Sequence, residues 1–156
     1  MLPNSYYITA TMRIVGALKQ LGIPFVCDLY TEMASKPFVV TAQSPGINGL
    51  AHPVVIEPKM NRIEDFDVIP NLRKHINGDP IDALKGMATA DALLVSRSTF
   101  SWLPALLSKG IILYHPYLYR TPKDWMATDD NGNFSSARLL TRLKAWKAQR
   151  QQPTRQ

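Results

Sequence analysis

The sequence predicts an α/β fold in which helices cover both faces of a mostly parallel sheet, in three layers. Short apolar runs that are typical of buried strands alternate with segments of helical periodicity along most of the chain. The clearest unit spans residues 92–115, where the run ALLV, a polar turn, an apolar helical segment and the run IILY follow one another. Two strands joined in this way are expected to be parallel, with a right-handed crossover between them.

The length and composition predict one domain. The chain has 156 residues, 46% of them hydrophobic, so it can bury one core and is too short for two full domains. We expect the domain to cover residues 1–150 and the polar end, residues 151–156, to be frayed. No apolar stretch is long enough to span a bilayer, and the first residues lack the pattern of a secretory signal. A cytoplasmic location is therefore the default expectation.

The chain is predicted to begin with a helix followed by a strand. Residues 5–21 have apolar side chains at helical spacing, with Asn4 or Ser5 as the candidate cap and Gly22 ending the helix. The mostly apolar run at residues 24–30 lies between turn signals, which is typical of a buried strand. Prolines and glycines then interrupt residues 33–61, and we expect an irregular excursion or lid there. Two short β-like runs within it lie at residues 38–41 and 54–57.

Helices and strands are expected to keep alternating along the rest of the chain. The predicted elements are a short helix at 63–69, a strand at 72–76 and helices at 80–90, 100–109 and 135–150. Asp79 is the candidate N-cap of the helix at 80–90, with Pro80 at its first position. In the last helix, Leu139, Leu143 and Trp146 share one face, so this helix is expected to pack across the sheet.

The net charge of +6 comes from the C-terminal segment. Six of the 18 basic residues follow residue 137, where there is no acidic residue, so residues 1–137 carry equal numbers of acidic and basic side chains. A basic stripe on a terminal helix is usually a solvated face. Binding to nucleic acid or to an anionic membrane is the weaker alternative.

No metal site is predicted. Cys27 is the single cysteine, so neither an intramolecular disulfide nor a cysteine zinc site can form, and we expect a buried structural thiol. His52, His75 and His115 are scattered without the spacing of a zinc site. Residues 129–132 resemble the start of a calcium loop but lack the later glutamate, which predicts a surface turn.

The polar turn between the two apolar runs is the candidate ligand site. It falls at the carboxyl edge of a predicted parallel sheet and before a helix, where backbone N–H groups and the helix dipole favour an anion. The candidate phosphate-binding residues are Ser96, Arg97, Ser98, Thr99, Phe100 and Ser101. The alternative is that Ser98 or Thr99 only caps the helix and Arg97 is solvated. The turn lacks the glycines of a Walker loop or a dinucleotide fingerprint.

Residues 82–114 carry a more specific pattern. Asp82 opens a predicted helix, Met87 follows in it, and a strand leads to Ser-Thr-Phe-Ser-Trp at residues 98–102. This pattern resembles the donor-binding part of fucosyltransferase-like glycosyltransferases of the GT-B architecture, which has two Rossmann-type domains. It is most similar to the α-1,2-fucosyltransferase pattern. The resemblance implies a Rossmann-like domain that is a single half of a GT-B enzyme.

The resemblance also implies a ligand, a nucleoside-diphosphate sugar and first of all a GDP-sugar. Residues 98–101 would hold the pyrophosphate, and Asp82 would lie near the base, where a carboxylate can accept the N–H groups of guanine. Further candidates for contact with the base or ribose are Thr31, Glu32 and His75. The transfer in this family is metal-independent, so no cofactor is expected beside the donor substrate.

The chain departs from the family in one large respect. The acceptor domain of the family, with its His-x-Arg-x-Gly-Asp turn, has no counterpart in this sequence. We therefore expect a fragment or half-enzyme that is completed by a missing N-terminal domain or a partner chain, and no catalytic residue is assigned. Such a half is expected to expose an apolar face or to form a homodimer through it.

The same residues have structural alternatives. Asp82 can be a first-turn acid favoured by the helix dipole, and Phe100 with Trp102 can be ordinary core. His115 follows the second strand of the β-α-β unit and shares the predicted ligand edge, where it either contacts a ligand or forms an internal hydrogen bond. The alternative function is a non-catalytic nucleotide-binding or protein-interaction module of the same fold.

Overall fold

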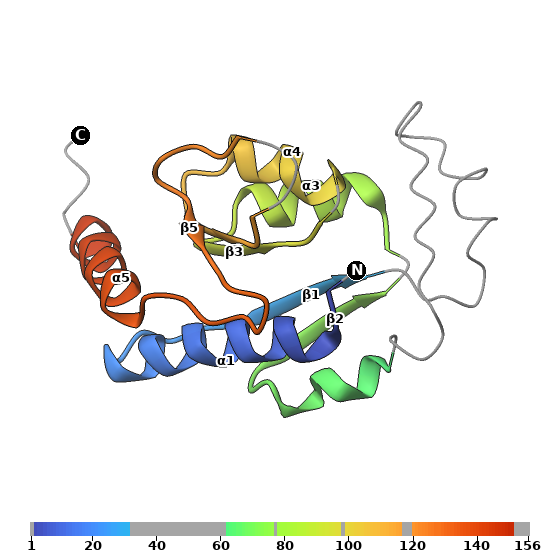
Figure 1. Ribbon diagram of the computed structural model, residues 1–156, viewed down its shortest axis with the longest axis horizontal. Helices are drawn as coiled ribbons and strands as arrows, with labels where there is room; N and C mark the ends of the chain where they lie inside the picture. The colour runs from blue at the N-terminus through green and yellow to red at the C-terminus, as the bar shows by residue number, and fades with distance from the viewer. Residues whose placement is uncertain (1, 32–61, 77, 98, 117–119, 152–156) are drawn as a thin grey trace.

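Helices and parallel strands alternate along the chain in the computed structural model, which describes residues 2–31, 62–76, 78–97, 99–116 and 120–151 (Figure 1). In chain order the elements are α1 (Asn4–Gln20), β1 (Cys27–Thr31), the 3-10 helix η1 (Ile63–Val68), β2 (Leu72–Ile76), α3 (Pro80–Ala88), β3 (Ala92–Val95), α4 (Thr99–Leu107), β4 (Ile111–Tyr114), β5 (Met126–Ala127) and α5 (Ser136–Gln151). The predicted α/β class is confirmed. The predicted excursion at 33–61, with its β-like runs at 38–41 and 54–57, lies outside the described residues.

The strands form two small parallel sheets. β1 pairs with β2, so that Tyr30 lies opposite His75. β4 lies between β3 and β5, and both of its pairings are parallel. β3, α4 and β4 therefore form the β-α-β unit that the sequence predicts. The two-residue strand β5 was not predicted.

Helices pack on both faces of the β3–β4–β5 sheet. On one face, Ile111 and Leu113 of β4 join a buried cluster with residues of α1, β5 and α5. On the other face, Ile112 joins a second cluster with residues of α3 and α4, which Figure 1 shows together on one side of β3. The period-2 alternation along β4 sends successive apolar side chains into different clusters. A strand buried on both faces must be apolar at nearly every position, as the run IILY is.

Local signals explain the ends of two helices. Gly22 has a φ of 65°, and the N–H groups of Gly22 and Ile23 donate to Lys19 and Leu18, which closes α1 in a Schellman motif. Asp79 caps α3 as predicted, because its carboxylate accepts hydrogen bonds from the backbone N–H groups of Ile81 and Asp82.

The predicted cap of α1 is wrong. Pro3 occupies the N-cap position, and no side chain caps the helix. Asn4 lies inside the helix instead, and its amide donates to the Arg62 carbonyl and the Asp65 carboxylate, both at 3.4 Å. These groups lie more than 50 residues away in the sequence, and their presence beside the helix could not be anticipated from local spacing.

The C-terminal helix α5 is attached to the body by its apolar face and by basic side chains. Leu139 and Leu143 are buried in the cluster with α1, and Trp146 packs against it, as predicted. The basic side chains also have partners in the body: Arg142 donates to the Asp124 carbonyl, Lys147 to the Leu21 carbonyl, and Arg150 pairs with Asp91. Three of the six basic residues that follow residue 137 therefore attach the helix to the body.

A tight turn after β5 contacts the start of α1. Asp129 accepts hydrogen bonds from the backbone N–H groups of Asn131 and Asn133, so the predicted turn is present. Gly132 has a φ of 83°, and a Cβ atom on it would lie 2.4 Å from the Tyr6 carbonyl oxygen. The turn is therefore not simply a surface feature, because Gly132 is buried against α1.

We predict that Gly132→Ala destabilises the fold by about 2–5 kcal/mol, because it combines a left-handed backbone with a clash against rigid helix backbone. The measurement is urea unfolding followed by circular dichroism. Gly16→Ala is the matched control: Gly16 lies within α1 with nothing within 4 Å of its added Cβ. That substitution should stabilise the protein by about 0.5–1 kcal/mol. Equal effects of the two substitutions would contradict this account of Gly132.

Candidate functional site

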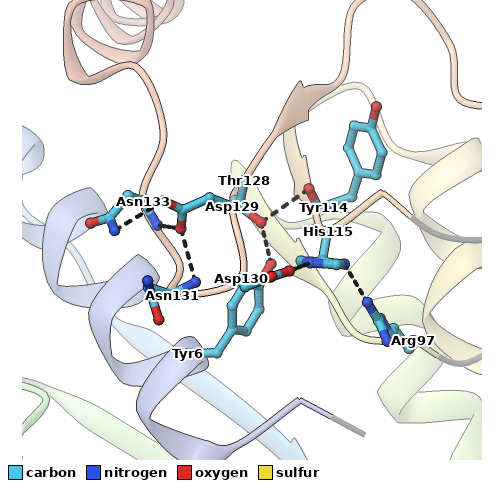
Figure 2. Close-up of polar contacts among 9 residues, drawn as sticks. All are labelled: Tyr6, Arg97, Tyr114, His115, Thr128, Asp129, Asp130, Asn131 and Asn133. Atoms are coloured by element: carbon cyan, nitrogen blue, oxygen red, sulfur yellow. Dashed lines mark hydrogen bonds and ion pairs between the residues drawn. The ribbon is translucent and has the colours of Figure 1, made fainter.

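The carboxyl ends of β3, β4 and β5 meet at one edge because the three strands are parallel. The residues that follow these strands are therefore neighbours: Ser96 and Arg97 after β3, His115 after β4, and the segment from Thr128 after β5. Figure 2 shows that Arg97, His115 and Asp130 lie in a row at this edge. The sequence placed the polar turn at residues 96–101 and His115 at one edge, and the structure places the described residues Ser96, Arg97 and His115 there.

His115 is held between an arginine and a carboxylate (Figure 2). Its Nδ1 lies 2.7 Å from Nη2 of Arg97, and its Nε2 lies 2.6 Å from Oδ1 of Asp130. An arginine can only donate, so Nδ1 must be the acceptor and Nε2 must carry the hydrogen that is donated to Asp130. The imidazole is neutral in this arrangement. The His115 side chain is only 9% exposed, whereas that of Asp130 is 89% exposed.

Tyr6 of α1 contacts the residues that follow β4 and β5 at this edge. The Tyr6 hydroxyl lies 2.6 Å from the Thr128 hydroxyl, which in turn donates to the Tyr114 carbonyl at 3.2 Å. The Tyr6 ring also packs against the His115 ring, with centroids 5.8 Å apart in an edge-to-face arrangement. Burial raises the pKa of Tyr6 above its usual value. These contacts fix the residues after β4 and β5 relative to α1.

Tyr7 is tied to the loop that carries Arg97. Burial raises the pKa of Tyr7 to about 12, while a hydrogen bond with the Arg97 backbone acts in the opposite direction. The sequence did not point to either tyrosine as a site residue. They lie about 90–120 positions from their partners, and no local pattern marks such a contact.

The turn between β3 and α4 is closed by two serines. The Ser101 hydroxyl donates to the Ser96 carbonyl at 3.0 Å, and the two hydroxyl oxygens lie 2.9 Å apart. Ser101 is buried, so its side chain lies inside the turn. Trp102 is buried beside Trp125, and Phe100 packs on the same cluster. Both residues are therefore part of the core, which is the structural alternative that the sequence offered for Phe100 and Trp102. Ser98 lies outside the described residues, and of Thr99 only the backbone is described.

The predicted base and ribose contacts lie on other elements. His75 is in β2, where its ring stacks on Tyr30 with centroids 4.5 Å apart and its Nε2 lies 2.8 Å from Asp28. Asp82 is exposed in the first turn of α3. Thr31 is the last residue of β1, and Glu32 lies outside the described residues. His75 and Asp82 are thus on β2 and on the helix that follows it, whereas Arg97 follows β3 and His115 follows β4.

Asp28 organises the polar face of the β1–β2 pair. It accepts two hydrogen bonds from Arg73, at 2.8 and 3.0 Å, in addition to its contact with His75. These interactions, with the Arg73 hydrogen bond foremost, hold the pKa of Asp28 below its usual value despite partial burial. Cys27 beside it is half-buried, less than the buried thiol that the sequence predicts, and burial raises its thiol pKa.

A hollow of about 290 Å³ lies at the opposite end of β4. Its lining includes Lys109 and Gly110, which lie between α4 and β4, and Arg142 of α5. No sequence pattern predicted this hollow. Since Lys109 and Gly110 precede β4 and His115 follows it, the hollow is separate from the carboxyl edge.

The described part of the chain was searched for metal sites and membrane-spanning helices, and the whole chain was compared with known proteins. Among the described residues, no group of three or more His, Cys, Asp or Glu side chains could hold a metal ion. In the same part of the chain, no helix has the length and apolar character needed to cross a membrane. Comparison of the chain with protein-family models, curated protein sequences and solved structures found no match. The chain's own residues are therefore the basis for assigning a function.

We predict that Asp28→Asn lowers the midpoint of urea unfolding at pH 7, and that the difference from wild type disappears under acidic conditions. The folded-state pKa of Asp28 lies below its ordinary value of 3.8, so the stabilisation is present above that pH. It is lost as the pH falls through the folded-state pKa. Asp67→Asn, which breaks an exposed ion pair with Lys74, is the control and should change the midpoint little at any pH. A constant difference between wild type and Asp28→Asn from pH 7 to pH 2.5 would contradict this assignment.

We predict that the protein loses stability between pH 10 and about 12 as Tyr7 ionises in the unfolded chain before it does so in the folded one. Tyr7→Phe should lower the free energy of unfolding at pH 7 by about 0.5–1.5 kcal/mol, because it removes the hydrogen bond to the Arg97 backbone. The variant should also show a smaller loss above pH 10. The measurement is ultraviolet titration of tyrosinate absorbance in Tyr7→Phe and in Tyr30→Phe. Tyr7→Phe should lack a group that titrates late, and Tyr30→Phe should retain it.

Proposed function

We propose that this chain binds a nucleoside-diphosphate sugar, with a GDP-sugar as the first candidate, at the carboxyl edge of the β3–β4–β5 sheet. It would thereby act as the donor-binding part of a fucosyltransferase-like glycosyltransferase. The observation that carries the proposal is the position of the segment from Ser96 to Ser101. It joins the carboxyl end of β3 to the first residues of α4, and Arg97 lies at the same edge.

The chemistry of this position suits a diphosphate. The first turn of a helix presents backbone N–H groups and the positive end of the helix dipole, and both stabilise an anion. A guanidinium beside them adds a charge that forms directed hydrogen bonds with phosphate oxygens. α4 begins at Thr99, two residues after Arg97, so both features fall within one short segment.

The architecture supports the family-level part of the proposal. The parallel pairings and the helices on both faces of the β3–β4–β5 sheet are consistent with a Rossmann-like, three-layer domain of the kind found in each half of a GT-B enzyme. Residues 82–114, which carry the resemblance to fucosyltransferases, form α3, β3, α4 and β4. In such an enzyme Asp82, exposed at the start of α3, would accept the N–H groups of guanine.

The contribution of this chain to transfer would be charge stabilisation. As the bond between the sugar and the diphosphate breaks, negative charge grows on the departing diphosphate, and fixed N–H donors and a cation lower the energy of that state. The acceptor site would come from a further domain or a partner chain.

One observation favours the alternative, a protein-interaction module of the same fold. The outer face of α4 exposes Leu103, Leu106 and Leu107 at 46%, 59% and 68%, and Ile81 of α3 is exposed as well. Exposed leucines on one helix are typical of an interaction surface. By contrast, Arg142, Lys147 and Arg150 bind groups of the body, which leaves fewer cations on α5 for a nucleic acid.

We predict that isothermal titration calorimetry of the whole chain shows saturable binding of one nucleoside diphosphate among GDP, GDP-fucose, UDP and UDP-glucose. Arg97→Gln should weaken this binding about tenfold or more, the usual effect of losing a hydrogen bond between charged groups. Arg138→Gln, which removes the same charge from an exposed position of α5, should leave the affinity unchanged.

The outcomes separate the hypotheses. If the folded protein binds none of the four nucleotides, the donor-binding proposal is wrong. The interaction module is then tested by cross-linking or sedimentation, in which the association of the wild-type chain is compared with that of Leu106→Ser. If Arg97→Gln and Arg138→Gln reduce affinity equally, binding is a non-specific response to charge and should fall steeply with salt.

A further inference from the structure

The row Arg97, His115 and Asp130 has a defined proton arrangement. Arg97 donates to Nδ1 of His115, and Nε2–H of His115 donates to Asp130. The proton that would make the imidazole cationic has no room at Nδ1, because that lone pair already accepts from a guanidinium. As long as Arg97 stays in this position, His115 is neutral and the row holds one positive and one negative charge.

We propose that an anion bound at this edge forms hydrogen bonds with Arg97 and thereby breaks the hydrogen bond between Arg97 and His115. His115 then takes up a proton at Nδ1. The inference rests on the proposed function and adds a regulatory property to the same site: binding of the diphosphate is coupled to proton uptake. The guanidinium turns its donors to the phosphate oxygens, the lone pair of Nδ1 is vacated, and a proton from solvent binds there. The imidazolium keeps its Nε2–H bond to Asp130.

The groups around the ring favour this protonation once Arg97 has moved. The ring meets Asp130 from the turn after β5, and it meets the Tyr6 ring of α1 in an edge-to-face contact. Asp129, beside Asp130, is bound by Asn131 and Asn133, and these hydrogen bonds hold its pKa below the usual value, so it stays an anion. The bound phosphate adds further negative charge. Arg97 is the cation that contacts the ring in the described residues, and its departure lowers the cost of a positive imidazole.

The pH dependence follows from linkage. If binding of the anion adds a proton to the protein, then lowering the pH must strengthen binding of the anion. Protonation of the ligand itself acts in the opposite direction, since phosphate groups lose charge near pH 6. The difference in pH dependence between wild type and His115→Gln isolates the contribution of His115 from that of the ligand. Gln can accept from Arg97 and donate to Asp130, but it cannot bind a proton.

The experiment is calorimetric titration of the whole chain with inorganic pyrophosphate, which carries no base or sugar, in buffers of different ionisation enthalpy between pH 6 and 8. Wild type should take up a fraction of a proton, and at most one, beyond the uptake seen with His115→Gln. The affinity ratio of wild type to His115→Gln should rise about tenfold from pH 8 to pH 6. Asp130→Asn should reduce the excess uptake, and Asp67→Asn, which removes an exposed carboxylate elsewhere, should not.

A second measurement does not depend on a variant. Nitrogen-15 NMR of the imidazole should show His115 protonated at Nε2 alone in the free protein, and at both nitrogens when pyrophosphate is bound. If pyrophosphate binds while His115 stays neutral, or if wild type and His115→Gln take up equal numbers of protons, the inference is overturned and the proposed function stands. If neither pyrophosphate nor any nucleotide binds to the folded chain, both are overturned.

Discussion

The parallel pairing of β4 with β3 on one side and β5 on the other is the constraint on which the rest of the structure depends. The parallel neighbours β3 and β4 require a crossover, which α4 supplies, and this crossover places a helix over one face of the sheet. The other face is then covered by α1 and α5, whose apolar side chains meet Ile111 and Leu113. With strands of four residues or fewer, nearly every position must contribute to burial.

The same pairing assembles the candidate site from parts of the chain that are distant in sequence. Parallel strands bring the segments after β3, β4 and β5 to one edge, and α1 reaches that edge with Tyr6 and Tyr7. Polar side chains described there are bound to one another: His115 to Arg97 and Asp130, and Tyr6 to Thr128. A charged ligand therefore competes with existing contacts, and its affinity includes the cost of breaking them.

Elements with strong local signals were predictable from sequence. The strands at 72–76, 92–95 and 111–114 were predicted to the residue, because apolar or alternating runs are bounded by turn residues, and α3 was predicted to start after Asp79. β5 was missed, since two residues carry no periodicity. The edge position of Ser96, Arg97 and His115 was also predictable, because these residues directly follow two parallel strands. The pairing of Arg97 with His115, and of Tyr6 with Thr128, depends on side-chain directions across 18 and 122 residues, which no local pattern encodes.

The shared cluster of α1 and α5 has a consequence for synthesis on the ribosome. Ile14 and Leu143 lie in one buried cluster, so the first helix described covers its face of the sheet together with the last helix described. While the strands emerge, Ile111 and Leu113 have α1 beside them but lack α5, and part of their apolar surface faces water. The nascent chain therefore passes through a stage in which its central strand is incompletely covered, the stage at which association with other chains competes with folding.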